Sequence, residues 1–274
     1  MKITFLGGGN MATALIGGMR KQNFSVAAMQ VVEPVEESRA KLTDTFGVRC
    51  CAAVDAAALN CEVLVLAVKP QQIKSALEPL TGQFRDHLTN QLVVSIAAGL
   101  RLPDISRWLG GYQQLVRCMP NTPALIGAGI TGLFAAAAVG REGRDTAEKI
   151  MRAVGNTLWI DNEAQMDAVT AVSGSGPAYV FYFIEALEQS AQALGFDAAT
   201  ARLLAIETFV GAARLAEQSH VPVSVLRERV SSKGGTTEAA LTSFNASGIH
   251  AAILKGVQAA AERGRQLGDE IGKG

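Results

Sequence analysis

The feature that most constrains the fold is a glycine-rich turn that comes directly after the first strand-like segment. Residues 3–6, Ile-Thr-Phe-Leu, are a strand-like run, and the next six residues, Gly7 to Ala12, read GGGNMA and fit the pattern G-x-G-x-x-A. In a strand–turn–helix unit, the first glycine permits a tight turn and the second lets the backbone approach a pyrophosphate. The small last residue lets helix and strand pack closely. The alternative is a structural glycine turn without a ligand.

The residues after this turn alternate between β-type and helical segments up to about residue 160. This alternation predicts βαβ units and a largely parallel sheet, so that residues 1–160 form an α/β, Rossmann-type dinucleotide-binding domain. The expected strands are 3–6, 28–32, 63–68, 92–96, 115–118, 131–134 and 157–160, and the clearest helices are 11–21 and 36–46.

After Asp161 the pattern becomes helical, with no further β-rich run bounded by turns. We expect an all-α second domain over residues 161–274, with helices at 163–172, 177–194, 198–219, 222–230, 235–245 and 249–267. The helix at 177–194 is apolar on nearly every side, which is typical of a helix that is buried all round. A second such helix at 199–216 favours an oligomer whose second domains share a core. A monomeric bundle is the alternative.

The dinucleotide is expected to lie at the carboxyl ends of the strands of the first domain. A helix that begins after the glycine turn offers its free N–H groups to phosphates. The candidate cofactor-binding residues are Gly7, Gly9, Asn10, Met11, Ala12, Glu33, Ala67, Val68, Lys69, Pro70, Ala97, Ala98 and Gly99. Small residues at 97–99 leave room for a nicotinamide ring, while Lys69 is either a cofactor contact or a solvated loop residue.

Glu33 and Arg39 give opposite indications about the cofactor. An acid at the end of the second strand usually accepts a hydrogen bond from a ribose 2′-hydroxyl, which favours NAD(H). Arg39 is close enough in sequence to meet a 2′-phosphate, which favours NADP(H). Glu33 is alternatively a solvated loop residue. We take NADP(H) as the first expectation, with NAD(H) as the alternative.

Composition excludes several classes of function. Lys plus Arg and Asp plus Glu each number 25, so the chain lacks the positive charge that nucleic-acid binding needs. No uncharged run reaches the length of a membrane span, and no apolar leader follows Met1. Four cysteines without a C-x-x-C pair and three scattered histidines predict no metal site. We expect a cytoplasmic protein with reduced thiols.

Three further motifs stand out in the sequence. Arg117-Cys118-Met119-Pro120-Asn121-Thr122-Pro123 follows a predicted strand. Ser173-Gly174-Ser175-Gly176-Pro177 is a small-residue turn before a helix. Ser231-Ser232-Lys233-Gly234-Gly235-Thr236-Thr237 precedes another helix, and its backbone N–H groups and hydroxyls form a candidate anion site.

Together with the glycine turn and Ala67-Val68-Lys69-Pro70, these motifs resemble pyrroline-5-carboxylate reductases over nearly the whole chain. The resemblance implies NAD(P)H-dependent reduction of L-1-pyrroline-5-carboxylate to L-proline, the last step of proline biosynthesis, by a homodimer or a higher homo-oligomer. It implies that Ser232, Gly235, Thr236 and Thr237 hold the substrate carboxylate and ring nitrogen. We expect Thr237 to be the catalytic residue, and we expect further substrate contacts from Met119, Asn121, Ser173, Gly174, Ser175, Gly176 and Gly234. Lys233 replaces the proline that is usual in the family.

The residues also fit this chemistry. Reduction of a ketone needs a proton donor such as His or Lys, and the helix at 177–194 carries neither. A cyclic imine enters as a protonated iminium and needs mainly alignment with the hydride donor. A β-hydroxyacid dehydrogenase is a weaker alternative, because its catalytic lysine is missing here. A non-catalytic NAD(P)-sensing protein is another, although it has no need for a second anion site.

Overall fold

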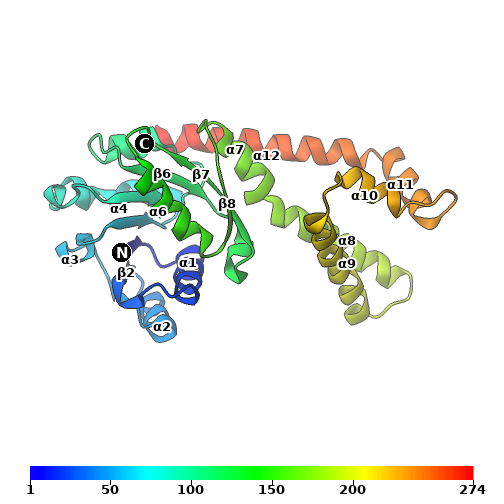
Figure 1. The fold of residues 1–274 in the computed structure, drawn as a ribbon, viewed down its shortest axis with the longest axis horizontal. Coiled ribbons are helices and arrows are strands. Elements are labelled where there is room, and N and C mark those ends of the chain that lie inside the picture. The colour runs from blue at the N-terminus through cyan, green and yellow to red at the C-terminus, as the bar shows by residue number, and fades with distance from the viewer. Residues whose placement is uncertain (274) are drawn as a thin grey trace. The chain divides into compact units, whose positions relative to one another are not determined.

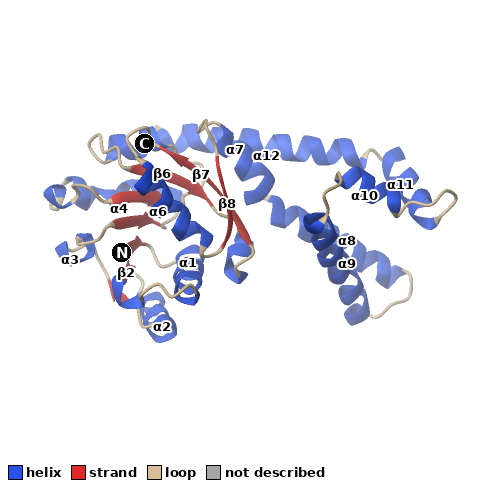
Figure 2. Ribbon diagram, viewed as in Figure 1, coloured by secondary structure: helices blue, strands red, loops and turns tan. Residues whose placement is uncertain are grey.

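The structure is a computed structural model that describes residues 1–273. Its strands form one eight-stranded sheet in the order β3-β2-β1-β4-β5-β6-β7-β8 (Figure 2). They are β1 (Ile3–Leu6), β2 (Met29–Val32), β3 (Arg49–Cys51), β4 (Val63–Leu66), β5 (Leu92–Ser95), β6 (Leu115–Met119), β7 (Gly129–Ala135) and β8 (Gly155–Trp159).

Helices connect the strands and make up the rest of the chain (Figure 1). They are α1 (Asn10–Lys21), α2 (Glu36–Phe46), α3 (Ala56–Leu59), α4 (Pro70–Thr81), α5 (Leu102–Trp108), α6 (Arg141–Arg152), α7 (Gln165–Val169), α8 (Gly176–Ala193), α9 (Ala198–Gln218), α10 (Val223–Arg229), α11 (Thr236–Ala246) and α12 (Ile249–Gly272). Short 3₁₀ turns lie at Val26–Ala28, Arg85–His87 and Thr122–Ile126, and a π-helical turn lies at Thr170–Gly174.

The predicted α/β Rossmann class is confirmed, with two differences in the sheet. Strand β3 was not predicted, because it has only three residues and pairs at the edge with β2 alone. Strand β7 runs antiparallel to β6, whereas all the other neighbouring strands are parallel. The connection at 120–128 is too short for the crossover helix that a parallel pair needs, so the chain turns back.

The core lies on both faces of this sheet, because successive side chains along a strand point to opposite sides. Phe5 faces α1, α2 and α6, whereas the next residue, Leu6, faces α3, α4 and α5. Both side chains are almost fully buried. Apolar residues therefore occupy consecutive positions in the central strands, as expected for a parallel sheet that helices cover on both faces.

The chain forms two compact units, residues 1–175 with 260–274 and residues 176–259. These units do not follow the predicted boundary at residue 160: α7 and the π-helical turn pack with the sheet, and so does the end of α12. Gly264, Gly268 and Gly272 face Asp167, Gly99 and Asp104 respectively. A side chain on Gly268 would approach the Gly99 carbonyl oxygen to 2.9 Å, so this spacing of glycines lets the end of α12, which belongs to the first unit, pack closely within that unit.

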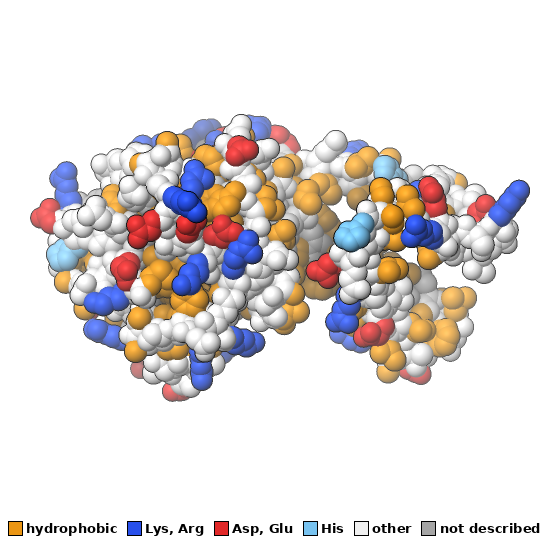
Figure 3. Space-filling model, viewed as in Figure 1, with side chains coloured by type: hydrophobic (Ala, Val, Ile, Leu, Met, Phe, Trp, Pro, Cys, Tyr) orange, Lys and Arg blue, Asp and Glu red, His pale blue; other side chains and the backbone are white. Residues whose placement is uncertain are grey.

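Helices α8 and α9 belong to the second unit and expose much of their apolar surface. The expectation that residues 177–194 are buried on all sides is wrong for the single chain, since α8 has no buried residue and Phe181 is 63% exposed. Val180, Phe181, Ile184, Ile206, Phe209 and Val210 line an open groove of about 670 Å³. Exposed hydrophobic side chains are also visible over α8 and α9 in Figure 3. A patch of this kind usually marks an interaction surface.

Candidate active site

The glycine turn after β1 has the geometry that a dinucleotide phosphate requires. Gly7 has φ 101°, and a Cβ atom there would lie 2.8 Å from the backbone of Ala67. Gly9 is the N-cap of α1, it has no side-chain cap, and nothing lies within 4 Å of where its Cβ would be. The amino end of α1 therefore opens onto free space with its N–H groups available, which fits a pyrophosphate.

Glu33 lies beside this turn at the end of β2. Its carboxylate accepts a hydrogen bond from Gly8 N at 2.8 Å and another from Val35 N at 2.9 Å. Arg39 lies in the same loop region, and its Nη1 donates to the carbonyl oxygens of Glu33 and Pro34, each at 2.8 Å. Both residues that bear on the cofactor choice are thus held by backbone groups.

The other predicted cofactor residues lie at the carboxyl ends of β4 and β5, next to the glycine turn in the sheet. Ala67 N donates to Leu6 O at 2.8 Å, which ties the end of β4 to the end of β1. Lys69 is exposed and is the N-cap of α4, which begins with Pro70. Ala97 is buried, and Gly99 lies against Leu267 of α12. Residues 67–70 and 97–99 therefore lie at the end of the sheet where the parallel strands have their carboxyl ends, as does the glycine turn.

The motif after β6 and the turn at 170–174 meet through Asn121. The Asn121 amide donates to Ser173 O at 3.1 Å, and Ile130 N donates to Asn121 Oδ1 at 2.9 Å. Asn121 is only 8% exposed, so its polar atoms join three segments of the protein. Its predicted substrate-binding role stays a prediction, and the structure adds a positioning role.

The small-residue turn that starts the second half of the chain is π-helical. Ser175 N donates to Thr170 O at 2.8 Å, and Ser173 Oγ donates to Val169 O at 2.9 Å. A side chain on Gly174 would approach Met119 Cε to 2.7 Å. Met119, Asn121, Ser173 and Gly174 are therefore neighbours, as predicted for one site. Single π turns of this kind are frequent at functional sites.

A buried ion-pair network lies close to this turn in the sequence, between β6 and the residues before and within α7. The sequence motifs do not predict this network. The Arg117 guanidinium lies 3.0 Å from the Glu163 carboxylate and 3.8 Å from that of Asp167, and its side chain is 3% exposed. Glu163 also accepts a hydrogen bond from Leu102 N at 2.8 Å. In the sequence, Arg117 stands out only as the first residue of a motif. The alternation of β6 already puts it on the same face as Met119, which was the available signal.

Gly176 is the first residue of α8. The other predicted substrate residues of the second unit lie in the turn before α11 and in the first two residues of that helix. Gly234 has φ 73°, Gly235 N donates to Ser232 O at 3.0 Å, and Gly235 is the N-cap of α11 without a side-chain cap. Glu238 accepts from Gly234 N at 2.6 Å. The amino end of this eleven-residue helix presents the N–H groups of Thr236 and Thr237 next to two hydroxyls, which fits the predicted anion site.

Comparison with known proteins decides the family. The chain is 42% identical to the pyrroline-5-carboxylate reductase of Pseudomonas aeruginosa, over 99% of this chain and 98% of that protein. The chain belongs to the pyrroline-5-carboxylate reductase family. The enzyme of that name from Haemophilus influenzae is 39% identical over 97% of each chain. Residues 163–267 match the family described as pyrroline-5-carboxylate reductase dimerisation, and residues 2–99 match NADP oxidoreductase, coenzyme F420-dependent.

Solved structures agree with this assignment to the reductase family. A pyrroline-5-carboxylate reductase from Coxiella burnetii has a TM-score of 0.89 at 40% identity and covers 97% of this chain and 98% of its own. A Plasmodium falciparum pyrroline carboxylate reductase with NADP bound has a TM-score of 0.86 at 27% identity, with 98% of both chains covered. A ketol-acid reductoisomerase at 12% identity and TM-score 0.63, covering 97% of this chain and 82% of its own, shares the fold alone.

Burial raises the pKa of three of the thiols of this reductase family member, which favours the protonated form. Cys118 directly follows Arg117 in β6 and is fully buried. This burial strongly raises the pKa of its thiol. Burial also raises the pKa values of Cys51 and Cys61. All four cysteines are free, and no group of His, Cys, Asp and Glu side chains within residues 1–273 forms a metal site. Nor does any helix in that range have the length and hydrophobicity to cross a membrane.

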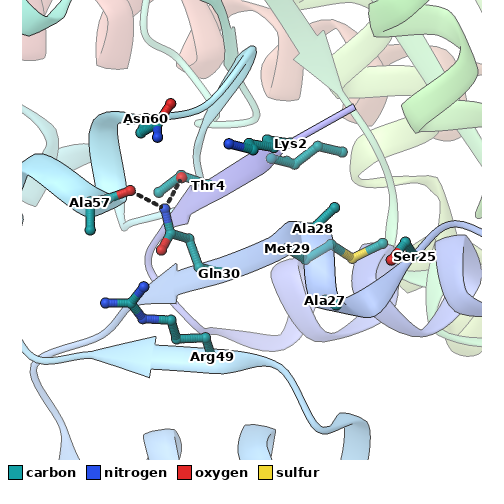
Figure 4. A pocket seen from close by; sticks show the side chains of 11 residues that line it. Lys2, Thr4, Ser25, Ala27, Ala28, Met29, Gln30, Arg49, Ala57 and Asn60 are labelled. Carbon is teal, nitrogen blue, oxygen red and sulfur yellow. Dashed lines mark hydrogen bonds between the residues drawn. The ribbon is translucent and has the colours of Figure 1, made fainter.

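A second hollow of about 400 Å³ lies at the amino ends of β1, β2 and β3. Lys2 and Arg49 lie at its rim, and the Gln30 amide donates to the Thr4 hydroxyl at 2.9 Å and to Ala57 O at 2.8 Å (Figure 4). This end of the strands is opposite to the glycine turn, so the hollow is separate from the candidate reductase site.

Proposed function

We propose that this protein reduces the cyclic imine L-1-pyrroline-5-carboxylate to L-proline, with NADPH or NADH as hydride donor. The observation that carries the proposal is the family relationship over 99% of the chain. The open amino end of α1 fits the dinucleotide, and the turn before α11 fits the substrate carboxylate. When bound, the reduced nicotinamide supplies the hydride.

The chain's own residues bind and orient the two reactants. The phosphates of the dinucleotide would be held by Gly7, Gly9, Asn10, Met11 and Ala12, with Glu33, residues 67–70 and residues 97–99 around the rest of it. The backbone N–H group of Thr236 and the Ser232 hydroxyl would hold the carboxylate, whereas the predicted N–H group of Gly235 already donates to Ser232 O. Thr237 Oγ would form a hydrogen bond to the ring nitrogen and orient it. Alignment of this kind contributes roughly 7–11 kcal/mol to lowering the barrier.

The other candidate substrate contacts belong to the two units separately. In the first unit they are Met119, Asn121, Ser173, Gly174 and Ser175, and in the second unit they are Gly176 and Gly234. No strong acid is required, since the iminium nitrogen already carries its proton. In this division of roles, residues 1–160 bind the dinucleotide and supply the candidate substrate contacts Met119 and Asn121. Residues 161–274 supply the other substrate contacts and associate with a second copy.

The assembly we propose is a homodimer or a higher homo-oligomer formed through the second half of the chain. The exposed apolar surface of α8 and α9 supports it, as does the match of residues 163–267 to a dimerisation family. The free cysteines support a reducing, cytoplasmic location.

A steady-state assay tests the function directly. Purified protein with pyrroline-5-carboxylate should consume NADPH or NADH, and proline should accumulate in equal amount. Thr237→Val should lower kcat/KM for the imine by about tenfold or more, because its hydroxyl is replaced by a methyl group of similar size. Thr242→Val, on the same helix, is the matched control and should leave kcat/KM unchanged. Dinucleotide binding without turnover would instead favour a sensor.

A further inference from the structure

The Glu33 carboxylate is fixed against the phosphate-binding turn. Gly8 N donates to one of its oxygens at 2.8 Å, and Val35 N donates to the other at 2.9 Å. The backbone on either side is also held, because Gly7 N donates to Val32 O at 2.8 Å and Glu33 N donates to Cys51 O at 2.9 Å. Glu33 is therefore not a solvated loop residue, which was the alternative interpretation of the sequence.

The negative charge of Glu33 has no paired cation. Among residues 1–273, no Lys, Arg or His nitrogen lies within 4.0 Å of its carboxylate. Arg39 is the nearest cation in sequence, but its Nη1 donates to the carbonyl oxygens of Glu33 and Pro34. The next helix adds two more acids, Glu36 and Glu37, in its first turn.

Two acceptor sites of the carboxylate are occupied, and a carboxylate offers about four. The remaining sites suit a hydroxyl donor, which is what the 2′ position of the adenine ribose in NADH presents. In NADPH the same position carries a phosphate with a charge of about −1.5 to −2 and no hydrogen-bond donor when fully ionised. That group would meet an uncompensated carboxylate.

Building on the reductase function proposed above, we propose that Glu33 makes this enzyme select NADH over NADPH. The arginine that would favour NADPH is held by main-chain carbonyls and supports the loop. This proposal differs from the first expectation from the sequence, NADP(H), which the closeness of Arg39 to Glu33 along the chain favours.

Calorimetric titration of the full-length protein with NADH and with NADPH tests the proposal without turnover. We expect the Kd for NADPH to be about tenfold or more above that for NADH. Glu33→Gln removes the charge and retains the shape, so it should lower the Kd for NADPH about tenfold and raise that for NADH a few-fold. The matched control is Glu37→Gln, an exposed acid four residues on, for which both Kd values should change less than about twofold.

Arg39→Gln separates the two roles of the arginine. If it only supports the loop, both Kd values should rise together. A rise confined to NADPH would show that Arg39 binds the 2′-phosphate and would overturn the proposal, as would equal or tighter binding of NADPH by the unmodified protein. That comparison needs no variant and therefore does not depend on folding of a mutant. Failure of both dinucleotides to bind would overturn the reductase function itself.

Discussion

Arg117 of β6 and Glu163, which lies before α7, form a buried ion pair with 3.0 Å between Arg117 Nη1 and Glu163 Oε1. The two residues connect the strand that leads into Met119 and Asn121 with the segment that leads into the π-helical turn at 170–174. The pair therefore fixes two parts of the candidate substrate pocket at once. This relationship has a direct consequence for stability.

Glu163→Gln should destabilise the protein by ~3 kcal/mol, because it leaves the buried Arg117 charge without its closest partner. The free energy of unfolding from urea titration measures this change. Asp145→Asn removes a surface ion pair with Arg141 and should change the same quantity by less than ~0.5 kcal/mol. Equal stability of Glu163→Gln and the unmodified protein would mean that Asp167 alone compensates Arg117.

Asn121→Ala should lower the free energy of unfolding by ~2 kcal/mol, since it leaves Ile130 N and Ser173 O without their partner. It should also raise KM for pyrroline-5-carboxylate more than it lowers kcat, because the turn at 170–174 loses its support. Urea titration and steady-state kinetics measure the two effects. A raised KM with unchanged stability would instead indicate direct contact between Asn121 and substrate.

Gly268→Ala should destabilise the protein by ~1–2 kcal/mol, because the added Cβ would lie 2.9 Å from Gly99 O and 3.2 Å from Arg101 Nε. Gly256→Ala, on the same helix, adds a methyl group with nothing within 4 Å and should stabilise the helix by ~0.5–1 kcal/mol. Thermal unfolding of the two variants gives the comparison. A Gly268→Ala variant that is more stable than the unmodified protein would contradict this prediction. It would show that α12 can shift to accommodate the methyl group without destabilising the fold.

Phe181→Asp should dissociate the proposed dimer, because it puts a charge into the exposed apolar surface of α8. The dimer Kd should rise by at least about thirtyfold in sedimentation experiments. Lys41→Glu, a charge change on the exposed side of α2, serves as the control and should leave the assembly intact. An unchanged dimer in the Phe181→Asp variant would place the interface on another surface.

Much of the architecture was predictable because it depends on local patterns. The strand–glycine–helix order at residues 3–12 predicted the first βα unit, and the long apolar and Ala-rich segments after residue 161 predicted α8, α9 and α12. The short strand β3 and the antiparallel direction of β7 were not predicted. The first is too short to give a pattern, and the second depends on the length of a connection rather than on the strand's own residues.

The sequence by itself determined the family, the dinucleotide turn and the motifs of the candidate site, because spacing within a motif is local. Only the tertiary structure decided which side chains meet. Asn121 and Ser173 are 52 residues apart, and Arg117 and Glu163 are 46 apart, so their contacts depend on how β6 and α7 pack. The position of Arg39 likewise depends on the tertiary structure, because the loop after β2 directs the carbonyl groups of Glu33 and Pro34 toward its guanidinium group. Hydrogen bonds and ion pairs depend on distance in space, which separation along the chain does not fix.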